Sequence, residues 1–95
     1  MRRPKKSKYK SVVIKKKRYY FYKITWLDIT GDSGHADLHS ALGFMPSVMV
    51  THAYMFNKDK KNIRTFASYE EGDELFSDRN VFPIGCITKM EKVTL

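Results

Sequence analysis

The stretch Tyr19-Tyr20-Phe21-Tyr22-Lys23-Ile24-Thr25-Trp26-Leu27-Asp28-Ile29 decides the fold of this chain. Aromatic and β-branched side chains dominate it, as they do in β-strands. Large apolar residues recur at every second position from Tyr20 to Trp26, whereas Lys23 and Thr25 lie on the other parity. Alternation of this kind predicts a half-buried β-strand. In a chain of 95 residues, such a strand predicts a mainly β domain with one modest core.

Outward from this strand, the predicted elements are short and mostly extended. A polar segment over residues 30–34 ends the strand, and residues 36–42 have the apolar spacing of a short helix. Further strands are predicted over residues 48–56, 63–69 and 81–93, the last interrupted by a turn at Pro83-Ile84-Gly85. Polar loops over residues 57–62 and 70–79 connect them, and residues 12–14 can extend the sheet. Four to five strands and one short helix predict a small twisted or barrel-like antiparallel sheet.

The charges are divided between two parts of the chain. The chain carries 18 Lys and Arg against 10 Asp and Glu, a formal net charge of +8. Eleven of the basic residues and no acidic residue lie within residues 1–23, which leaves a net charge of −3 for residues 24–95. We therefore divide the chain into a basic, flexible N-terminal arm over residues 1–18 and a small β domain over residues 19–95. A basic arm on a non-basic body is the composition expected for binding a polyanion, most often nucleic acid.

We expect this arm to bind DNA or RNA through phosphate contacts that do not depend on base sequence. The expected contacts are the basic side chains of the arm and the first ring after them: Arg2, Arg3, Lys5, Lys6, Lys8, Lys10, Lys15, Lys16, Lys17, Arg18 and Tyr19. Residues 15–18 run directly into the predicted strand, so they should be held at the domain surface, whereas residues 1–10 should stay loose. Rings beside the cations that face outward could stack on unpaired bases. We assign Tyr22, Ile24 and Trp26 to the core.

No pattern in the chain supports catalysis, and we expect a non-enzymatic protein without a metal or a cofactor. Gly31-Asp32-Ser33-Gly34 is similar to the surroundings of a protease serine, but no histidine precedes it, and a turn before a helix explains it. His35 and His39 would share a helix face, yet two ligands make a weak zinc site. The acidic loop over residues 70–78 lacks the spacing of an EF-hand. We expect this loop to be solvated and to lie near the basic residues.

A resemblance to a known family rests on several short motifs. Tyr22-Lys23-Ile24-Thr25-Trp26-Leu27-Asp28 resembles the opening strand of small uncharacterised proteins of tailed phages. The order after it is also similar: a polar Asp/Ser/Gly loop, a short helix, a strand after Pro46 that ends in an aromatic residue, and the segment Phe82-Pro83-Ile84-Gly85-Cys86-Ile87-Thr88-Lys89-Met90. The resemblance covers about residues 22–90 and not the arm. It implies a compact SH3-like β-barrel and a viral setting, but no particular activity.

Two other functions are open at the level of sequence. A phage-encoded domain could bind a host or phage protein, with a partner strand added to an exposed sheet edge. The chain could also be a structural component of a viral particle or a ribonucleoprotein, in which a basic arm becomes ordered on assembly. Cys86 is the single cysteine, so no internal disulfide is expected, and no apolar run is long enough to span a bilayer. We expect a protein of the host cytoplasm, free or associated with the virion, without membrane binding.

Overall fold

The computed structural model describes residues 8–95 and is mainly β. Within these residues there are six strands: β1 (Ser11–Ile14), β2 (Lys17–Asp28), β3 (Ser47–Lys58), β4 (Asn62–Tyr69), β5 (Phe76–Pro83) and β6 (Ile87–Lys92). A short helix, α1 (Leu38–Leu42), lies between β2 and β3, and a 3-10 helix, η1 (Ile84–Cys86), lies between β5 and β6. The prediction of a mainly β fold is confirmed. The strand beyond the four to five predicted is β1, which includes the short apolar segment of residues 12–14.

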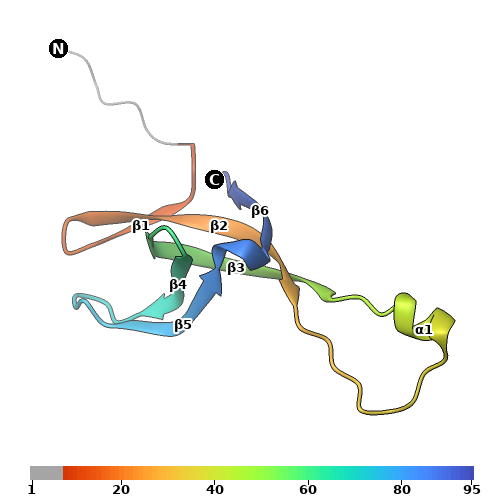
Figure 1. The fold of residues 1–95 in the computed structure, drawn as a ribbon. Helices are drawn as coiled ribbons and strands as arrows, with labels where there is room; N and C mark the ends of the chain where they lie inside the picture. Colours follow the sequence, from red (N-terminus) through yellow and green to blue (C-terminus); the bar gives the residue numbers. More distant parts are fainter. Residues whose placement is uncertain (1–7) are drawn as a thin grey trace.

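All the strands belong to one antiparallel sheet with the order β1-β2-β3-β4-β5, and β6 also pairs with β2. The central strand is β2, because β3 pairs along one of its edges while β1 and then β6 pair along the other. Figure 1 shows that β4 and β5 turn across the long ribbon that β2 and β3 form. Within residues 8–95 no ladder joins β5 to β1 or to β6, so the sheet is open.

The chain just before β1 is attached to the same edge of the sheet. Tyr9 forms an isolated bridge with Thr94. The backbone N–H of Lys10 donates to the carbonyl of Val93 at 2.8 Å, and the N–H of Phe21 donates to the carbonyl of Lys10 at 3.0 Å. The boundary expected after residue 18 therefore falls inside β2, and the described part of the basic arm belongs to the sheet. Residues 1–7, which include four of the expected phosphate contacts, lie outside the described residues.

The core is small and consists largely of aromatic rings. One cluster joins Ile14, Tyr19 and Phe66, with Tyr54 and Phe76 among the half-buried side chains packed against it. The rings of Tyr19 and Phe66 meet edge to face with their centroids 5.3 Å apart, an arrangement worth about 0.5–1.5 kcal/mol beyond the area buried. In this cluster, side chains of β1, β2 and β4 pack together at one end of the sheet.

A second group of buried residues lies further along β2. Ile24 is fully buried, and Ala53 and Phe82 are also buried. Trp26 packs edge to face on Phe82 at 5.3 Å, and its indole N–H donates to the hydroxyl of Thr51 at 2.9 Å. The assignment of Ile24 to the core is confirmed, whereas Tyr22 and Trp26 are half-buried.

Two predicted boundaries need correction. The strand β5 begins at Phe76, inside the loop expected over residues 70–79, and most of its side chains are exposed. It pairs only with β4, so its outer edge faces solvent and its side chains need not alternate between polar and apolar. The helix α1 is shorter than the predicted residues 36–42 and has no buried residue. Asp37 caps it, because its carboxylate accepts a hydrogen bond from the N–H of Ser40 at 2.7 Å.

The segment between β2 and β3 extends far from the rest of the molecule (Figure 1). Every side chain from residue 28 to residue 50 is exposed. The radius of gyration is 18.1 Å, whereas a compact chain of this length has a radius of about 12 Å. The long dimension of the molecule is 69 Å, against 28 and 24 Å across. We call residues 29–50 the projection; it lies at the opposite end from the turn that joins β1 and β2.

Candidate nucleic-acid interface

The tip of the β1–β2 hairpin consists of two lysines. Ile14 pairs with Lys17 in the ladder, so Lys15 and Lys16 are the whole connection. Their φ angles are 48° and 69°, and positive φ at both central residues is the requirement of a type I′ turn. Such turns strongly prefer Asn-Gly, because left-handed backbone costs other L-residues about 1–2 kcal/mol. The hairpin thus has charged side chains at positions where the backbone favours other residues.

Four consecutive exposed cations therefore lie at this tip, over residues 15–18. The residues on either side of them, Ile14 and Tyr19, are 6% and 5% exposed and both pack against Phe66. Arg18 is further oriented by a hydrogen bond from its guanidinium to the hydroxyl of Ser11 at 2.6 Å. Because both flanking residues are fixed in the core, the backbone of the basic run has a defined position on the surface. The structure agrees with the prediction that residues 15–18 are held at the surface of the domain.

A second set of cations lies along the edge formed by residues 8–10 and β6. The ammonium of Lys10 lies 4.1 Å from the centre of the Phe21 ring. The ammonium of Lys92 lies 4.3 Å from the centre of the Tyr20 ring and 5.2 Å from that of Tyr9. Cation–π contacts of this kind contribute about 0.5–1 kcal/mol at exposed sites. They hold the long lysine side chains in place, while Lys10 and Lys92 stay exposed to solvent.

The backbone brings this second set to the same edge of β2 as the hairpin. The N–H of Leu95 donates to the carbonyl of Lys8 at 2.8 Å, and the N–H of Val93 donates to the carbonyl of Phe21 at 3.0 Å. We call seven exposed cations along this edge and at the hairpin the basic face: Lys8, Lys10, Lys15, Lys16, Lys17, Arg18 and Lys92. They flank the edge on both sides of the sheet, because Lys10 lies over Phe21 and Lys92 over Tyr20, and neighbouring side chains of a strand point to opposite sides. Lys89 of β6 is also exposed and is paired with Glu91 at 3.6 Å. Lys92 was not among the expected contacts, because 74 positions separate it in sequence from Arg18. The pairing of β2 with β6, in which Lys92 lies opposite Tyr22, brings Lys92 close to the hairpin.

Tyr19 is not part of this face, and its expected role as an interface residue needs correction. It is 5% exposed, and its ring contacts Phe56, Phe66 and Phe76 with centroids 6.0, 5.3 and 5.7 Å away. Burial raises the pKa of its phenol, and the negative charge of Glu74 raises it further. Its ring is enclosed by other rings and presents no open face to a base. The half-buried Tyr20 is the neighbouring ring that lies beside the cations.

The acidic loop between β4 and β5 lies next to the hairpin. A hollow of about 360 Å³ is lined on one side by residues 12–15 and on the other by Tyr69, Glu70, Glu71 and Gly72. No ion pair joins the two sides within residues 8–95. The carboxylates of this loop therefore lower the positive potential at the tip without fixing any lysine. This arrangement agrees with the expectation that the loop lies near the basic residues.

The other candidate residues of the sequence lie in the projection, away from the basic face. Asp32 accepts a hydrogen bond from the N–H of Gly34 at 2.8 Å, as in an Asx turn. Asp37 is occupied as the helix cap, and hydrogen bonds from Ser40 lower the pKa of its carboxyl. His35 and His39 are exposed. Within residues 8–95 no group of three or more His, Cys, Asp and Glu side chains is placed to hold a metal ion.

No family model, no curated protein and no solved structure matches this chain. The resemblance to tailed-phage proteins therefore stays a hypothesis drawn from the short motifs alone. Among residues 8–95, no helix has both the length and the apolar character needed to cross a membrane.

Proposed function

We propose that this protein is a non-enzymatic nucleic-acid-binding protein whose basic face contacts phosphates without reading base sequence. The observation that supports the proposal best is the run of exposed cations over residues 15–18, held between Ile14 and Tyr19 in the core. Each basic side chain that neutralises a phosphate releases condensed counterions, and this release gives affinity for any sequence. Residues 1–7 would add Arg2, Arg3, Lys5 and Lys6 beside Lys8.

The lack of sequence specificity in this proposal follows from the shape of the basic face. Reading base edges in the major groove usually requires a helix or a two-stranded ribbon that fits into it. The helix α1 has five residues and lies at the opposite end of the molecule from the hairpin (Figure 1). The hairpin could approach a groove, but the side chains at its tip are lysines, which bind phosphate as point charges. Phosphate contacts of this kind position a protein and carry no sequence information.

The proposed setting is that of a phage protein with an SH3-like fold, acting in the host cytoplasm or with the virion. Two features support the fold assignment: β2 pairs along both edges, and a 3-10 turn at η1 leads into the last strand. Along one edge β2 exchanges β1 for β6, so one long strand belongs to two parts of the sheet, as in small barrels whose long strands bend. Within residues 8–95 the sheet does not close into a barrel, because β5 does not pair with β1. The short motifs named above support the phage origin.

A salt titration of DNA and RNA binding tests the function. We would measure the anisotropy of a labelled 30-base-pair duplex and of a labelled single strand across a range of KCl concentrations. The variant Lys15→Gln, Lys16→Gln and Lys17→Gln should bind more weakly, and its log–log salt slope on duplex DNA should be flatter by about 2.7, at ~0.9 for each lost phosphate contact.

A matched control removes the same charge elsewhere. Lys58, Lys60 and Lys61 are exposed and lie around the β3–β4 connection, where the carbonyl of Lys61 accepts a hydrogen bond from Ile84 at 2.8 Å. Replacing these three lysines by glutamine changes the net charge equally and should leave the slope nearly unchanged. Equal losses in the two triple variants would show that only the overall charge matters, and no loss in either would reject nucleic-acid binding by the basic face.

A further inference from the structure

The projection carries large apolar side chains that are mostly exposed. Ile29, Leu38, Leu42, Met45 and Val48 are exposed to 93, 76, 76, 70 and 67%. A helix of five residues is far below the length at which isolated helices are stable in water, and α1 buries none of its own residues. Exposed apolar side chains that gather on one segment are typical of protein–protein contact sites. The projection therefore has the properties of a segment that is covered by a partner.

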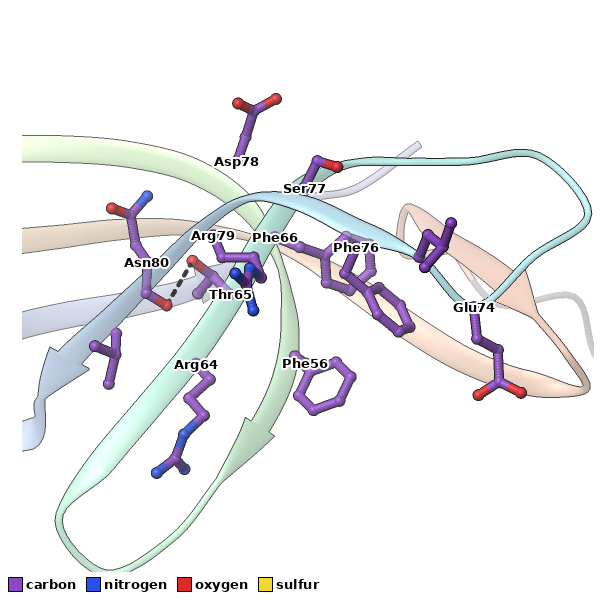
Figure 2. Close-up of a pocket in the computed structure, with 12 residues that line it drawn as sticks. Phe56, Arg64, Thr65, Phe66, Glu74, Phe76, Ser77, Asp78, Arg79 and Asn80 are labelled. Atoms are coloured by element: carbon purple, nitrogen blue, oxygen red, sulfur yellow. Dashed lines mark hydrogen bonds between the residues drawn. The ribbon is translucent and has the colours of Figure 1, made fainter.

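The same molecule has an open groove that could cover it. The groove has a volume of about 940 Å³ and is lined by Phe56 of β3, by residues 64–66 of β4, and by residues 74–81 of the following loop and β5. Figure 2 shows Phe56, Phe66 and Phe76 around it. Leu75 and Val81, which also line it, are exposed to 56 and 59%. The open edge of the sheet thus leaves apolar surface uncovered at this end.

The projection offers apolar and acidic side chains, and the groove offers apolar side chains and one arginine, Arg79, that is unpaired within residues 8–95. Leu38 and Leu42 are four positions apart, so they lie on one face of α1, as in helices that dock into apolar grooves. Residues 28–57 contain no Lys or Arg and include Asp28, Asp32 and Asp37. The groove is lined by Arg64 of β4 and Arg79 of β5, and also by the acidic residues Glu74 and Asp78.

Figure 2 shows this arrangement of charges directly. Arg64 and Glu74 extend on the side of β4 and β5 where Phe56 lies, whereas Asp78 extends on the opposite side. Arg64 is paired with Asp59 at 2.8 Å. Arg79 takes part in no ion pair within residues 8–95. An acidic, apolar segment would therefore find both apolar contacts and an available guanidinium in this groove.

We propose that the projection of one copy docks in the groove of a second copy, with α1 seated between β3, β4 and β5. The occupant is not the molecule's own projection, because α1 lies at the far end of the molecule from β4 and β5 (Figure 1) and all of its side chains are exposed. The projection is about as long as the ~20–30 residues that each side contributes to a standard protein interface. Two copies that exchange projections form a closed dimer, and one-way docking forms an open chain.

Complementation between two defective variants tests this contact. The projection variant carries Leu38→Asp and Leu42→Asp, and the groove variant carries Leu75→Asp and Val81→Asp. All four side chains are exposed, so these changes leave the core of each copy intact. Nuclease-treated protein in 0.5 M KCl would be followed by sedimentation velocity over a range of concentrations. Full-length protein should self-associate, and each variant alone should do so at least about tenfold more weakly.

The mixture of the two variants decides between the possible contacts. It contains one intact projection and one intact groove, so it should form dimers and nothing larger. A groove variant that associates as well as the unchanged protein would overturn the proposal in favour of pairing between projections or between β3 edges. Unchanged protein that stays monomeric at every concentration would overturn it outright. If a charged variant loses the circular dichroism of the sheet, the milder single substitutions Leu42→Ser and Val81→Ser replace it in the same experiment.

Discussion

The turn between β1 and β2 allows stability and binding to be separated in one experiment. Lys15 and Lys16 have φ angles of 48° and 69°, which cost about 1–2 kcal/mol each. The substitutions Lys15→Asn and Lys16→Gly introduce the dipeptide that type I′ turns prefer. Asparagine keeps part of the cost, and glycine gives back about 0.5–1 kcal/mol through its freedom in the unfolded chain. We therefore expect a gain of about 1–2 kcal/mol in the free energy of unfolding, measured by urea denaturation.

The same double substitution removes two cations from the basic face. The salt slope on duplex DNA should become flatter by about 1.8, so that affinity falls while stability rises. Lys15→Gln with Lys16→Gln is the control, because it removes both charges and keeps side chains that are unfavourable at positive φ. This control should weaken binding equally without the same gain in stability. If the Asn-Gly variant is no more stable than the Gln-Gln variant, the inference that positive φ at these lysines costs stability is refuted. An unchanged salt slope in either variant would refute the role of Lys15 and Lys16 in binding DNA.

Three further predictions concern Tyr19, Asp59 and the pair Glu70 and Glu71. Tyr19→Ala should lower the free energy of unfolding by about 3–5 kcal/mol, because it removes a ring packed among other rings; a loss below about 1 kcal/mol in urea denaturation would contradict its place in the core. The pKa of Asp59 is lowered to about 2, first by the hydrogen bond from Arg64 and then by two backbone N–H groups, so its carboxylate should stabilise the fold above about pH 4 and lose this effect as the pH falls toward 2. Urea midpoints between pH 1.5 and 5 should show this step in the unchanged protein and not in Asp59→Asn. Glu70→Gln with Glu71→Gln should raise the affinity for DNA about two- to five-fold at low salt, since the loop faces the hairpin and exposed charge pairs are worth ~0.2–1 kcal/mol; the gain should shrink as KCl increases, and a gain that persists at high salt would argue against an electrostatic cause.

Alternation predicted the strands well where one face of the sheet is buried. It failed in β5, where burial follows no alternation and only Phe82 is buried. An edge strand with one neighbour can be built from polar residues, because its backbone pairing and not its side chains holds it in the sheet. The turn at Lys15 and Lys16 was missed for a related reason. Turn predictions depend on Asn, Gly and Asp, and here the strand pairing imposes positive φ on two lysines.

The misplacement of Tyr19 has a physical cause within β2. The sequence places Ile24 and Tyr20 on one face, yet the structure buries Ile24 and Tyr19, which have opposite parity. The partners of β2 change between these positions, since β1 pairs with residues 17–20 and β6 and β3 pair with the residues that follow. The strand therefore turns a different face toward the core in each half. A single sequence shows the alternation but does not show where a long strand exchanges its partners.

The two proposed contacts, polyanion binding by the basic face and docking of the projection on a second copy, are coupled through charge. Copies with a formal net charge of +8 repel one another, and this repulsion opposes self-association at low salt. The projection and the basic hairpin lie at opposite ends of the molecule (Figure 1), so copies joined through the projection keep their basic faces available. A polyanion bound across several basic faces neutralises the repulsion and raises the effective concentration of neighbouring copies. Linkage then requires that self-association strengthen polyanion binding by the same factor. The projection variant with Leu38→Asp and Leu42→Asp should therefore bind long DNA more weakly than the unchanged protein does, and bind an oligonucleotide that accommodates one copy equally well.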